Sequence, residues 1–221
     1  MGGTKRYMFI VAHPDDEVLG AGALIHKLIE QEQAVHVVIL NADIEKTRPD
    51  MYEDVERSHE ILGVRSRSLF GFRNMDFYNE DHREMVEKIE EELLAFKPDF
   101  IFTHSDQDLH NDHRITSICV QQAARIWQRH NTGYKPSALY FMEVQSSSDW
   151  SRHPFKPDTY VNVFSDDMEA KIKALKVYKN VIRERPHPRS TDAICALAII
   201  RGSEIGHRWA EAFKTVWRDC L

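Results

Sequence analysis

The sequence has few cysteines, and they do not form a disulfide framework. Cys119, Cys195 and Cys220 are the three cysteines among 221 residues, and they lie far apart without a Cys-x-x-Cys pair. This pattern excludes a secreted disulfide scaffold and predicts a reducing compartment, most simply the cytoplasm. The N-terminus runs directly into a short apolar segment without a small-residue cleavage site, so we do not expect a signal peptide.

Long hydrophobic runs and an excess of positive charge are also lacking. No window approaches about 18 uninterrupted apolar residues, so no membrane span is predicted. The 35 acidic residues outnumber the 29 basic ones, and the net charge of −6 argues against a general binder of nucleic-acid phosphates. No Walker A motif, nucleophile elbow or dinucleotide fingerprint is present. Histidine, in contrast, occurs 12 times, and its positions are informative.

Short strand-like segments alternate with helical ones along the chain. Strands are predicted at residues 7–12, 35–40, 68–72, 100–103, 139–144 and 160–164. Helical spacing of apolar residues predicts helices at 17–31, 50–62, 82–96, 115–129, 168–181 and most of 191–217. The alternation predicts a three-layer, Rossmann-like α/β fold whose mainly parallel central sheet is covered by helices on both faces. Without repeats or low-complexity linkers, a single domain over residues 1–221 is expected.

Two clusters of ionisable side chains each follow a predicted strand, at 7–12 and at 100–103. Their members are His13, Asp15, Asp16, Glu17, Asp106, Asp108, His110, Asp112 and His113. In a parallel sheet, ligands bind beyond the carboxyl ends of the strands, so both clusters are expected to open onto one site. Asp112, next to His113, could hold a histidine ring by its second nitrogen.

The residue types in these clusters are those of a catalytic metal site. Such a zinc site needs three His, Asp or Glu ligands and one open position, which His13, Asp16 and His113 could provide. Asp15 is then a candidate general base beside the attacking water. His110 is a candidate electrophile or general acid beside the reacting carbonyl oxygen. Zinc suits these ligands, although Fe²⁺ or another divalent ion also accepts them.

Simpler interpretations are open for each cluster taken alone. Asp15, Asp16 and Glu17 could merely cap the first turn of a helix. Asp106 and Asp108 could be turn residues in a solvated loop. Because two clusters with complementary ligands follow strands of one predicted sheet, the metal site is the stronger hypothesis.

Both clusters resemble the signature motifs of the PIG-L/LmbE-like de-N-acetylase family. Residues 12–17, Ala-His-Pro-Asp-Asp-Glu, match the first motif in full. Residues 108–113 match the second at every polar position, with Asn111 where proline is frequent. Residues 61–63 and 201–213 are similar to later family segments. The resemblance implies a zinc-dependent hydrolase that removes the N-acetyl group from an N-acetylglucosamine-type sugar or glycoconjugate.

The resemblance also implies roles for individual residues. It places zinc on His13, Asp16 and His113. It makes Asp15 the general base and His110, in its protonated form, the group that stabilises the oxyanion.

Substrate contacts are less well matched to the family. The resemblance implies a contact at Asp76, which follows the third predicted strand. Met51 stands where the family often has arginine, and Arg48, one turn earlier, is a possible substitute. A basic loop further along could receive a phosphate or nucleotide diphosphate carried by the sugar, or could simply be solvated. Its arginines are Arg183, Arg185 and Arg189.

Two alternative functions are left open. One is a metal-dependent amidase for another amide, such as a thiol conjugate or an antibiotic intermediate. The other is a catalytically silent sugar- or nucleotide-binding protein of the same fold, against which the presence of Asp15 and His110 argues. The expected partner is a small amino-sugar substrate, with no nucleic acid. The apolar late helices would allow a homo-oligomer.

Overall fold

The computed structural model describes residues 3–42, 49–150 and 152–219. Seven strands form one sheet in the order β3-β2-β1-β4-β5-β7-β6. The strands are β1 Arg6–Val11, β2 Ala34–Ile39, β3 Arg67–Leu69, β4 Phe100–His104, β5 Ala138–Met142, β6 Thr159–Asn162 and β7 Ala210–Arg218. β1 to β5 run parallel, and β7 is antiparallel to both of its neighbours. The prediction of a mainly parallel sheet is confirmed.

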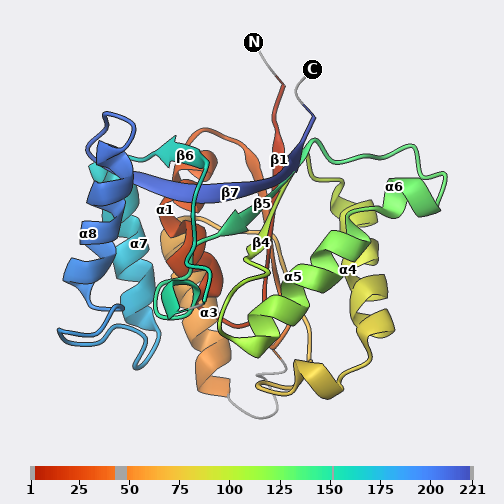
Figure 1. Cartoon of the computed structure of the whole chain (residues 1–221), viewed down its shortest axis with the longest axis horizontal. Coiled ribbons are helices and arrows are strands. Elements are labelled where there is room, and N and C mark those ends of the chain that lie inside the picture. Colours follow the sequence, from red (N-terminus) through yellow and green to blue (C-terminus); the bar gives the residue numbers. More distant parts are fainter. Residues whose placement is uncertain (1–2, 43–48, 151, 220–221) are drawn as a thin grey trace.

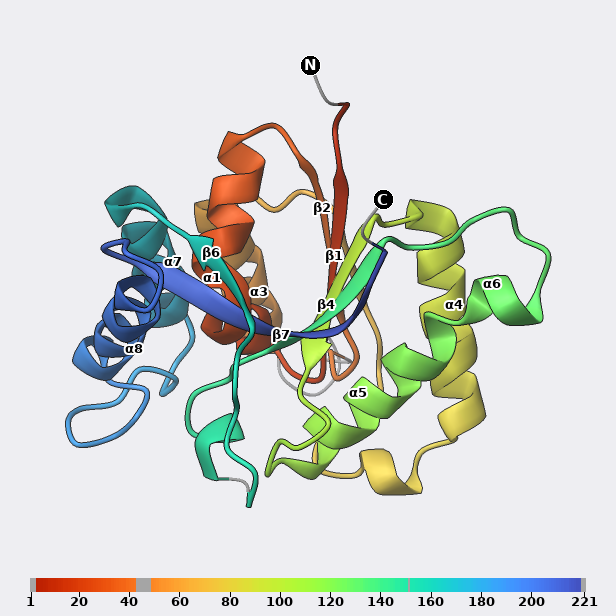
Figure 2. The same cartoon turned by 45° about the horizontal axis from the view of Figure 1, so that its top comes forward.

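Helices cover both faces of this sheet (Figures 1 and 2). One side carries α1 Asp16–Glu30, α3 Pro49–Leu62 and α7 Ser165–Val177, with α8 Thr191–Ser203 packed against β6 and β7. The other side carries α4 His82–Phe96, α5 Asn111–Ala123 and α6 Ile126–Arg129. Short 3₁₀ turns, η1 Phe77–Asn79 and η2 Ser148–Trp150, lie in the loops. The predicted three-layer α/β architecture is therefore confirmed.

The two cores follow from the alternation of side chains along each strand. In β1, Phe9 and Val11 pack in the core beneath α1, α3 and α7, whereas Met8 and Ile10 pack in the core beneath α4 and α5. Successive strand residues point to opposite faces, so a strand covered on both faces must be apolar throughout. This requirement explains why the central strands were recognisable in the sequence.

The C-terminal segment differs from the prediction. Residues 191–217 were expected to be mostly helical, but α8 ends at Ser203 and β7 follows. β7 enters the sheet between β5 and β6, and Phe213 becomes fully buried in the core. The Ala-Glu-Ala-Phe start of this strand has residues that favour helices, and pairing with strands on both sides overrides that preference.

The sheet places two loops side by side. β1 and β4 are parallel neighbours, and Phe9 is paired with Phe102. Both strands therefore end at the same edge, where the backbone N–H of Ala12 donates to His104 Nε2 at 2.9 Å. The two ionisable clusters follow these strand ends, as the sequence predicted.

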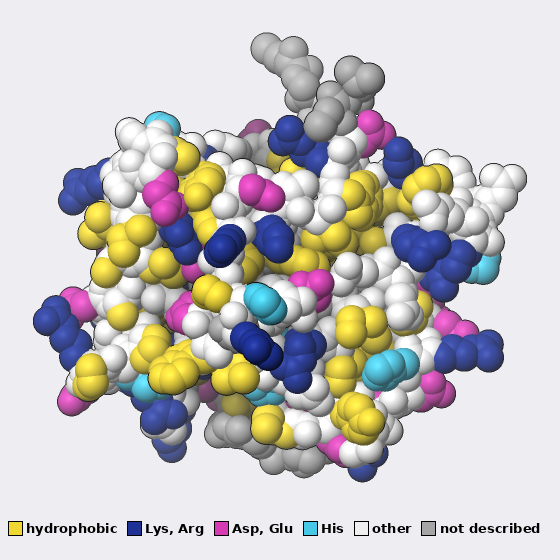
Figure 3. All heavy atoms as spheres, in the orientation of Figure 1, with side chains coloured by type: hydrophobic (Ala, Val, Ile, Leu, Met, Phe, Trp, Pro, Cys, Tyr) yellow, Lys and Arg dark blue, Asp and Glu magenta, His cyan; other side chains and the backbone are white. Residues whose placement is uncertain are grey.

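Charges of both signs are mixed on the face of the molecule that Figure 3 shows. In Figure 3, Lys and Arg side chains are dispersed among Asp and Glu over the visible face. No helix in the described part of the chain is long and apolar enough to cross a membrane.

Candidate active site

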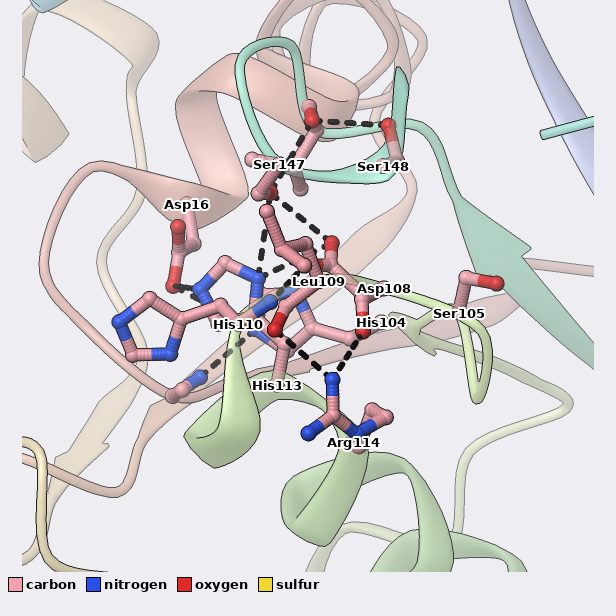
Figure 4. Close-up of polar contacts among 12 residues, drawn as sticks. Asp16, His104, Ser105, Asp108, Leu109, His110, His113, Arg114, Ser147 and Ser148 are labelled. Carbon is pink, nitrogen blue, oxygen red and sulfur yellow. Dashed lines mark hydrogen bonds and ion pairs between the residues drawn. The ribbon is translucent and has the colours of Figure 1, made fainter. Parts of the chain in front are cut away.

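Two of the predicted metal ligands, His13 and His113, converge on the carboxylate of the third, Asp16. Asp16 Oδ2 lies 3.2 Å from His13 Nδ1 and 3.2 Å from His113 Nε2. Asp16 opens α1 and His113 lies in the first turn of α5, so the adjacency of β1 and β4 brings them together. Both side chains are 2 % exposed. Figure 4 shows Asp16 facing the group of histidines that follows β4.

A second carboxylate holds each of the two histidines from behind. His13 Nε2 lies 3.0 Å from Asp112 Oδ2, and His113 Nδ1 lies 3.1 Å from Asp108 Oδ2. The remaining ring nitrogens, His13 Nδ1 and His113 Nε2, are thereby directed toward Asp16. Histidines that bind metals are typically oriented by a carboxylate in this way. Two imidazoles and one carboxylate form a donor set that fits zinc or another divalent ion.

The charges of these groups reinforce one another. Burial lowers the pKa of His113, but the charge of Asp16 and a hydrogen bond to Asp108 raise it by more, to about 10. Burial likewise lowers the pKa of His13, and its hydrogen bonds to Asp112 and Asp16 raise it to about 9. Burial raises the pKa of Asp16, but the charges and hydrogen bonds of His113 and His104 together outweigh burial and hold this pKa well below its usual value. Asp16 is therefore a buried anion that attracts cations.

Hydrogen bonds fix the loop that carries the second cluster (Figure 4). Asp108 accepts from the Ser147 hydroxyl at 2.9 Å and from the His110 backbone N–H at 2.8 Å. Arg114 Nη1 donates to the carbonyl oxygens of Asp108 at 2.6 Å and Leu109 at 2.7 Å. Asp108 is therefore a positioned partner of the site, not a solvated turn residue. Ser147 comes from the loop after β5, and no motif around it predicted this contact.

His104 lies behind the predicted ligands. Its ring is fully buried and stacks on His113 with 3.9 Å between ring centroids. Its Nε2 accepts the backbone N–H of Ala12, so the lone pair of this nitrogen is already used. Burial, together with the charge of His113, lowers the pKa of His104 to about 4. Although Asp16, His104 and His113 are close enough to hold a cation, the bond to Ala12 makes His104 a packing partner in this geometry.

Asp15 is directed into the cavity by an unusual backbone conformation. Its φ is 97° and its ψ is −27°, and its side chain makes no capping hydrogen bond to α1. A non-glycine residue in a sparsely populated backbone region costs about 1–3 kcal/mol, and such residues cluster at functional sites. Asp15 is 8 % exposed. Burial and the charge of Asp16 raise the pKa of its carboxyl well above the usual value. The helix-capping interpretation of Asp15 is therefore wrong.

Glu17, the third acid of the first motif, points into the interior instead. It is fully buried, and its Oε1 lies 3.1 Å from His59 Nε2 and 3.3 Å from the Tyr178 hydroxyl. His59 belongs to α3, and Tyr178 directly follows α7. Glu17 thus ties the start of α1 to both neighbouring helices and does not face the cavity.

His110 borders the predicted ligands, and its ring lies beside those of His13 and His113. Its Nδ1 accepts the backbone N–H of Asp112 at 3.2 Å, so the single proton of the neutral ring resides on Nε2. Burial, together with the charges of His113 and His13, lowers its pKa to about 4. In this geometry His110 offers Nε2–H as a hydrogen-bond donor, and the protonated ring expected from the sequence stays a prediction.

These groups lie on one wall of an open cavity of about 520 Å³. The described residues that line it are His13, Pro14, Asp15, Asp16, Asn41, Met51, Gly71, Phe72, Arg73, Asn74, Met75, His110, His113 and Arg189. The volume is typical of a small-molecule site. All the residues expected to bind metal or to catalyse therefore share this cavity.

The two predicted substrate contacts have a different outcome. Asp76 is not among the described lining residues. Its Oδ1 accepts from Asn79 Nδ2 at 2.5 Å, and its Oδ2 lies 3.6 Å from Arg73 Nη1. The structure thus does not bring Asp76 into the cavity, because neighbours on its own loop bind it. Arg48 lies outside the described residues, and its role stays a prediction.

Comparison with known proteins agrees with the site. Residues 8–124 match the PIG-L family, described as GlcNAc-PI de-N-acetylase. This stretch is more than half of the chain and contains both clusters, so the chain belongs to the PIG-L family. The resemblance seen in the sequence is confirmed, and with it the enzyme class, a hydrolytic de-N-acetylase. Neither alternative, the amidase for another amide or the silent binding protein, is favoured.

Individual relatives share the full length of the fold. Diacetylchitobiose deacetylase of Thermococcus kodakarensis is 25 % identical over 229 residues, covering 96 % of this chain and 84 % of that protein. A conserved protein of Thermus thermophilus has a TM-score of 0.80 at 22 % identity, covering 97 % and 96 % of the two chains. GalB, the 4-carboxy-2-hydroxymuconate hydratase of Pseudomonas putida KT2440, has a TM-score of 0.78 at 18 % identity, covering 99 % and 98 %. Because a hydratase has this fold, the fold alone does not determine the reaction.

Proposed function

We propose that the protein is a metal-dependent hydrolase that removes the N-acetyl group from an N-acetylglucosamine-type sugar or glycoconjugate. The observation that carries this proposal is the convergence of His13 and His113 on Asp16, with Asp15 directed into the same cavity. Membership of the PIG-L family supports the reaction. The similarity to diacetylchitobiose deacetylase supports an acetylated amino sugar as the substrate.

His13, Asp16 and His113 would hold the metal, and zinc is the ion we propose. Fe²⁺ or another divalent ion is compatible with the same donors. A bound ion of this kind polarises a carbonyl oxygen and makes water more acidic.

The chain's own residues then act on the proton and on the developing charge. Asp15 accepts a proton from the water that attacks the acetamide carbon, and His110 donates the Nε2–H to the oxygen on which negative charge develops. The carbon–nitrogen bond breaks, and the proton held by Asp15 is placed to reach the leaving amine. The products are acetate and the free amino sugar. Asp15 thus serves in both proton transfers, and His110 serves as the donor.

Other features of the protein stay predictions. The two described cysteines, Cys119 and Cys195, are free thiols, which supports the proposal of a reducing, cytoplasmic location. A single domain over residues 1–221 is also proposed, because every described strand belongs to one sheet. We also propose that the protein forms a homo-oligomer and has no nucleic-acid partner.

The test is release of acetate from N-acetylglucosamine derivatives by the zinc-loaded protein. We expect Asp15→Asn to retain its metal and to lose about two to four orders of magnitude in rate, the usual size of a general-base effect. Asp106→Asn is the matched control, because this acid lies on a neighbouring loop but does not line the cavity. Near-normal turnover of Asp15→Asn would show that another group is the base. A zinc-loaded wild type that releases no acetate from any acetylated amino sugar would contradict the proposed function.

A further inference from the structure

Arg189 carries a positive charge into the cavity from the loop between α7 and α8. Its Nη1 lies 3.3 Å from Asp15 Oδ2, and its Nε donates to the Ser146 hydroxyl at 2.8 Å. The side chain is 22 % exposed and borders the same cavity as the predicted metal ligands. The sequence had placed Arg189 in a basic loop without separating it from its neighbours.

The loop presents this arginine in a defined position. The backbone N–H of Arg189 donates to His187 Nδ1 at 3.0 Å, and its carbonyl accepts the N–H of Arg183 at 3.2 Å. These two bonds close the loop on itself next to Arg189. Arg185, in contrast, pairs with Asp192 at 2.5 Å, and its side chain is 74 % exposed. Of these two arginines, Arg189 therefore lines the cavity.

The Arg189 guanidinium has N–H donors that no described residue accepts. A guanidinium has five N–H donors, and its strongest carboxylate pairs are bidentate at about 2.7–2.9 Å. Its contact with Asp15 is a single bond at 3.3 Å. Within residues 3–42, 49–150 and 152–219, no group accepts a hydrogen bond from Nη2 of Arg189. The arginine thus retains donors for a second anion.

The other charges around the cavity single out Arg189 as the group that would receive such an anion. Arg73 also borders the cavity, but Glu80 at 3.0 Å and Asp76 at 3.6 Å already balance its charge. Among the described lining residues, the acids are Asp16, which is a predicted metal ligand, and its neighbour Asp15. Away from those two acids, the described wall carries no negative charge that would repel an anionic group.

We propose that Arg189 forms an anion subsite and that the substrate is an N-acetylated amino sugar bearing a carboxylate or phosphate group. The carboxylate or phosphate of the substrate pairs with the unused donors of Arg189, while the acetamide lies against Asp15 and His110. This inference rests on the proposed function, because both use one cavity. The substrate is thus anionic, although the chain itself has a net charge of −6.

The kinetic test compares neutral and anionic substrates. N-acetylglucosamine is the neutral substrate, its 1-phosphate and 6-phosphate supply the phosphate, and N-acetylmuramic acid supplies the carboxylate. For the wild type, we expect kcat/KM to be about 10- to 100-fold higher for one anionic class, the size of a hydrogen bond to a charged group. A preference for the phosphates or for the carboxylate identifies the anion. No preference for any anionic substrate would overturn the subsite.

Variants of Arg189 separate substrate binding from an effect on Asp15. Arg189→Gln should raise KM for the preferred anionic substrate about 10- to 100-fold more than it raises KM for the neutral substrate. Arg189→Lys should restore part of the preference, because lysine keeps the positive charge but cannot form the bidentate hydrogen bonds of a guanidinium. Arg185→Gln is the matched control, and we expect it to leave both substrates unchanged. An equal loss for neutral and anionic substrates in Arg189→Gln would overturn the proposal, because Arg189 would then act only through Asp15.

Binding of the reaction products gives a readout that needs no turnover. By isothermal titration calorimetry, the deacetylated form of the preferred anionic substrate should bind at least about tenfold more tightly than glucosamine, and Arg189→Gln should abolish the difference. If this difference is found but no substrate releases acetate, the subsite stands and the proposed function fails. If acetate is released from neutral and anionic substrates at equal rates and the products bind equally, the proposed function stands and the subsite fails.

Discussion

Two buried polar clusters contact helix α1, and they are built on opposite principles. The first is the site at the start of the helix. The second surrounds the break in its middle, where Ala21 has the non-helical angles φ −151° and ψ 18°. Lys171 Nζ lies 2.6 Å from Glu211 Oε1 and donates to the carbonyl oxygen of Leu19 at 2.7 Å. Glu211 also accepts the N–H of Ala23 at 3.2 Å.

The second cluster is complete within the chain. Leu19 O and Ala23 N would bond to each other in an uninterrupted helix. The Lys171–Glu211 ion pair is inserted between them and satisfies both. Gly22 makes room for it, because an added Cβ would lie 3.1 Å from Lys171 Cγ. The charges of Lys171 and Glu211 balance each other, so we interpret this cluster as one that stabilises the fold.

In the first cluster the donors and acceptors are not balanced one to one, because two imidazoles face a single carboxylate. Asp16 Oδ2 lies 3.2 Å from a ring nitrogen of His13 and 3.2 Å from one of His113, and a second carboxylate already holds the other nitrogen of each ring. Asp15 beside it is held in a strained backbone conformation, which costs stability. The comparison of the two clusters indicates that balanced donors and acceptors mark a structural role, whereas converging ligands and backbone strain mark a functional one.

Removal of one ligand should give the largest effect at the first cluster. We expect His113→Ala to lose the bound metal and at least about a thousandfold in activity, because the metal supplies several kcal/mol of charge stabilisation. Metal content by mass spectrometry and acetate release are the measurements. The control is His130→Ala, whose side chain is exposed. Full metal content in folded His113→Ala would remove the distinction between the clusters.

Disruption of the second cluster should affect stability without removing the metal. Lys171→Met leaves Glu211 buried and unpaired, which should lower the free energy of unfolding by about 3–5 kcal/mol. Denaturant unfolding measures this loss, and metal content should stay at the wild-type value. The double variant Lys171→Met with Glu211→Gln should recover part of the stability, because a neutral amide costs less to bury. A single-variant loss below about 1 kcal/mol would show that the ion pair is dispensable.

A weaker change at the first cluster tests the carboxylate behind a ligand. Asp112→Asn keeps the shape of the side chain but weakens its hold on His13 Nε2. We expect a 10- to 100-fold loss of metal affinity, about 1.4–2.7 kcal/mol, as for other carboxylates that orient a ligating histidine. Competition with a fluorescent chelator measures the affinity, with Asp106→Asn again as the control. The backbone N–H of Met75 also donates to Asp112 Oδ2, at 2.7 Å. Unchanged affinity would mean that Asp112 serves only to hold this loop.

The smallest effect is expected at a pair remote from both clusters. Glu92 Oε2 lies 2.9 Å from His36 Nε2, and this hydrogen bond lowers the pKa of Glu92. A lowered pKa in the folded state stabilises the protein above the unfolded pKa, and the contribution is lost as pH falls through the folded value. Glu92→Gln should therefore cost up to about 1 kcal/mol at pH 7. The cost should shrink below about pH 4, where unfolded Glu92 becomes protonated. Urea unfolding at both pH values measures this, and a pH-independent cost would contradict it.

Much of the fold and of the candidate site could be predicted from the sequence. Buried parallel strands are apolar on both faces, so β1, β2, β4 and β5 were visible as short apolar runs. The acids and histidines at residues 13–17 follow β1, and those at residues 106–113 follow β4. Both were placed at one edge because the carboxyl ends of parallel strands share it.

The remaining features depend on contacts between distant segments. β7 contains helix-favouring residues, and only its position between β5 and β6 makes it a strand. The tautomer of His110 is set by a backbone N–H, and the role of Arg189 depends on how the loop after α7 folds against the loop after β5.

The sequence by itself determined that residues 13–17 and 106–113 share one edge of the sheet, and it supplied the metal ligands and the general base that we propose. All three follow from local periodicity, from the rule that strand ends meet and from the two motifs. Tertiary structure alone decided which carboxylate holds each histidine, that Lys171 and Glu211 bridge the break in α1, and that Arg189 reaches Asp15. These contacts join residues from separate loops and helices, and the packing of the whole chain sets their distances.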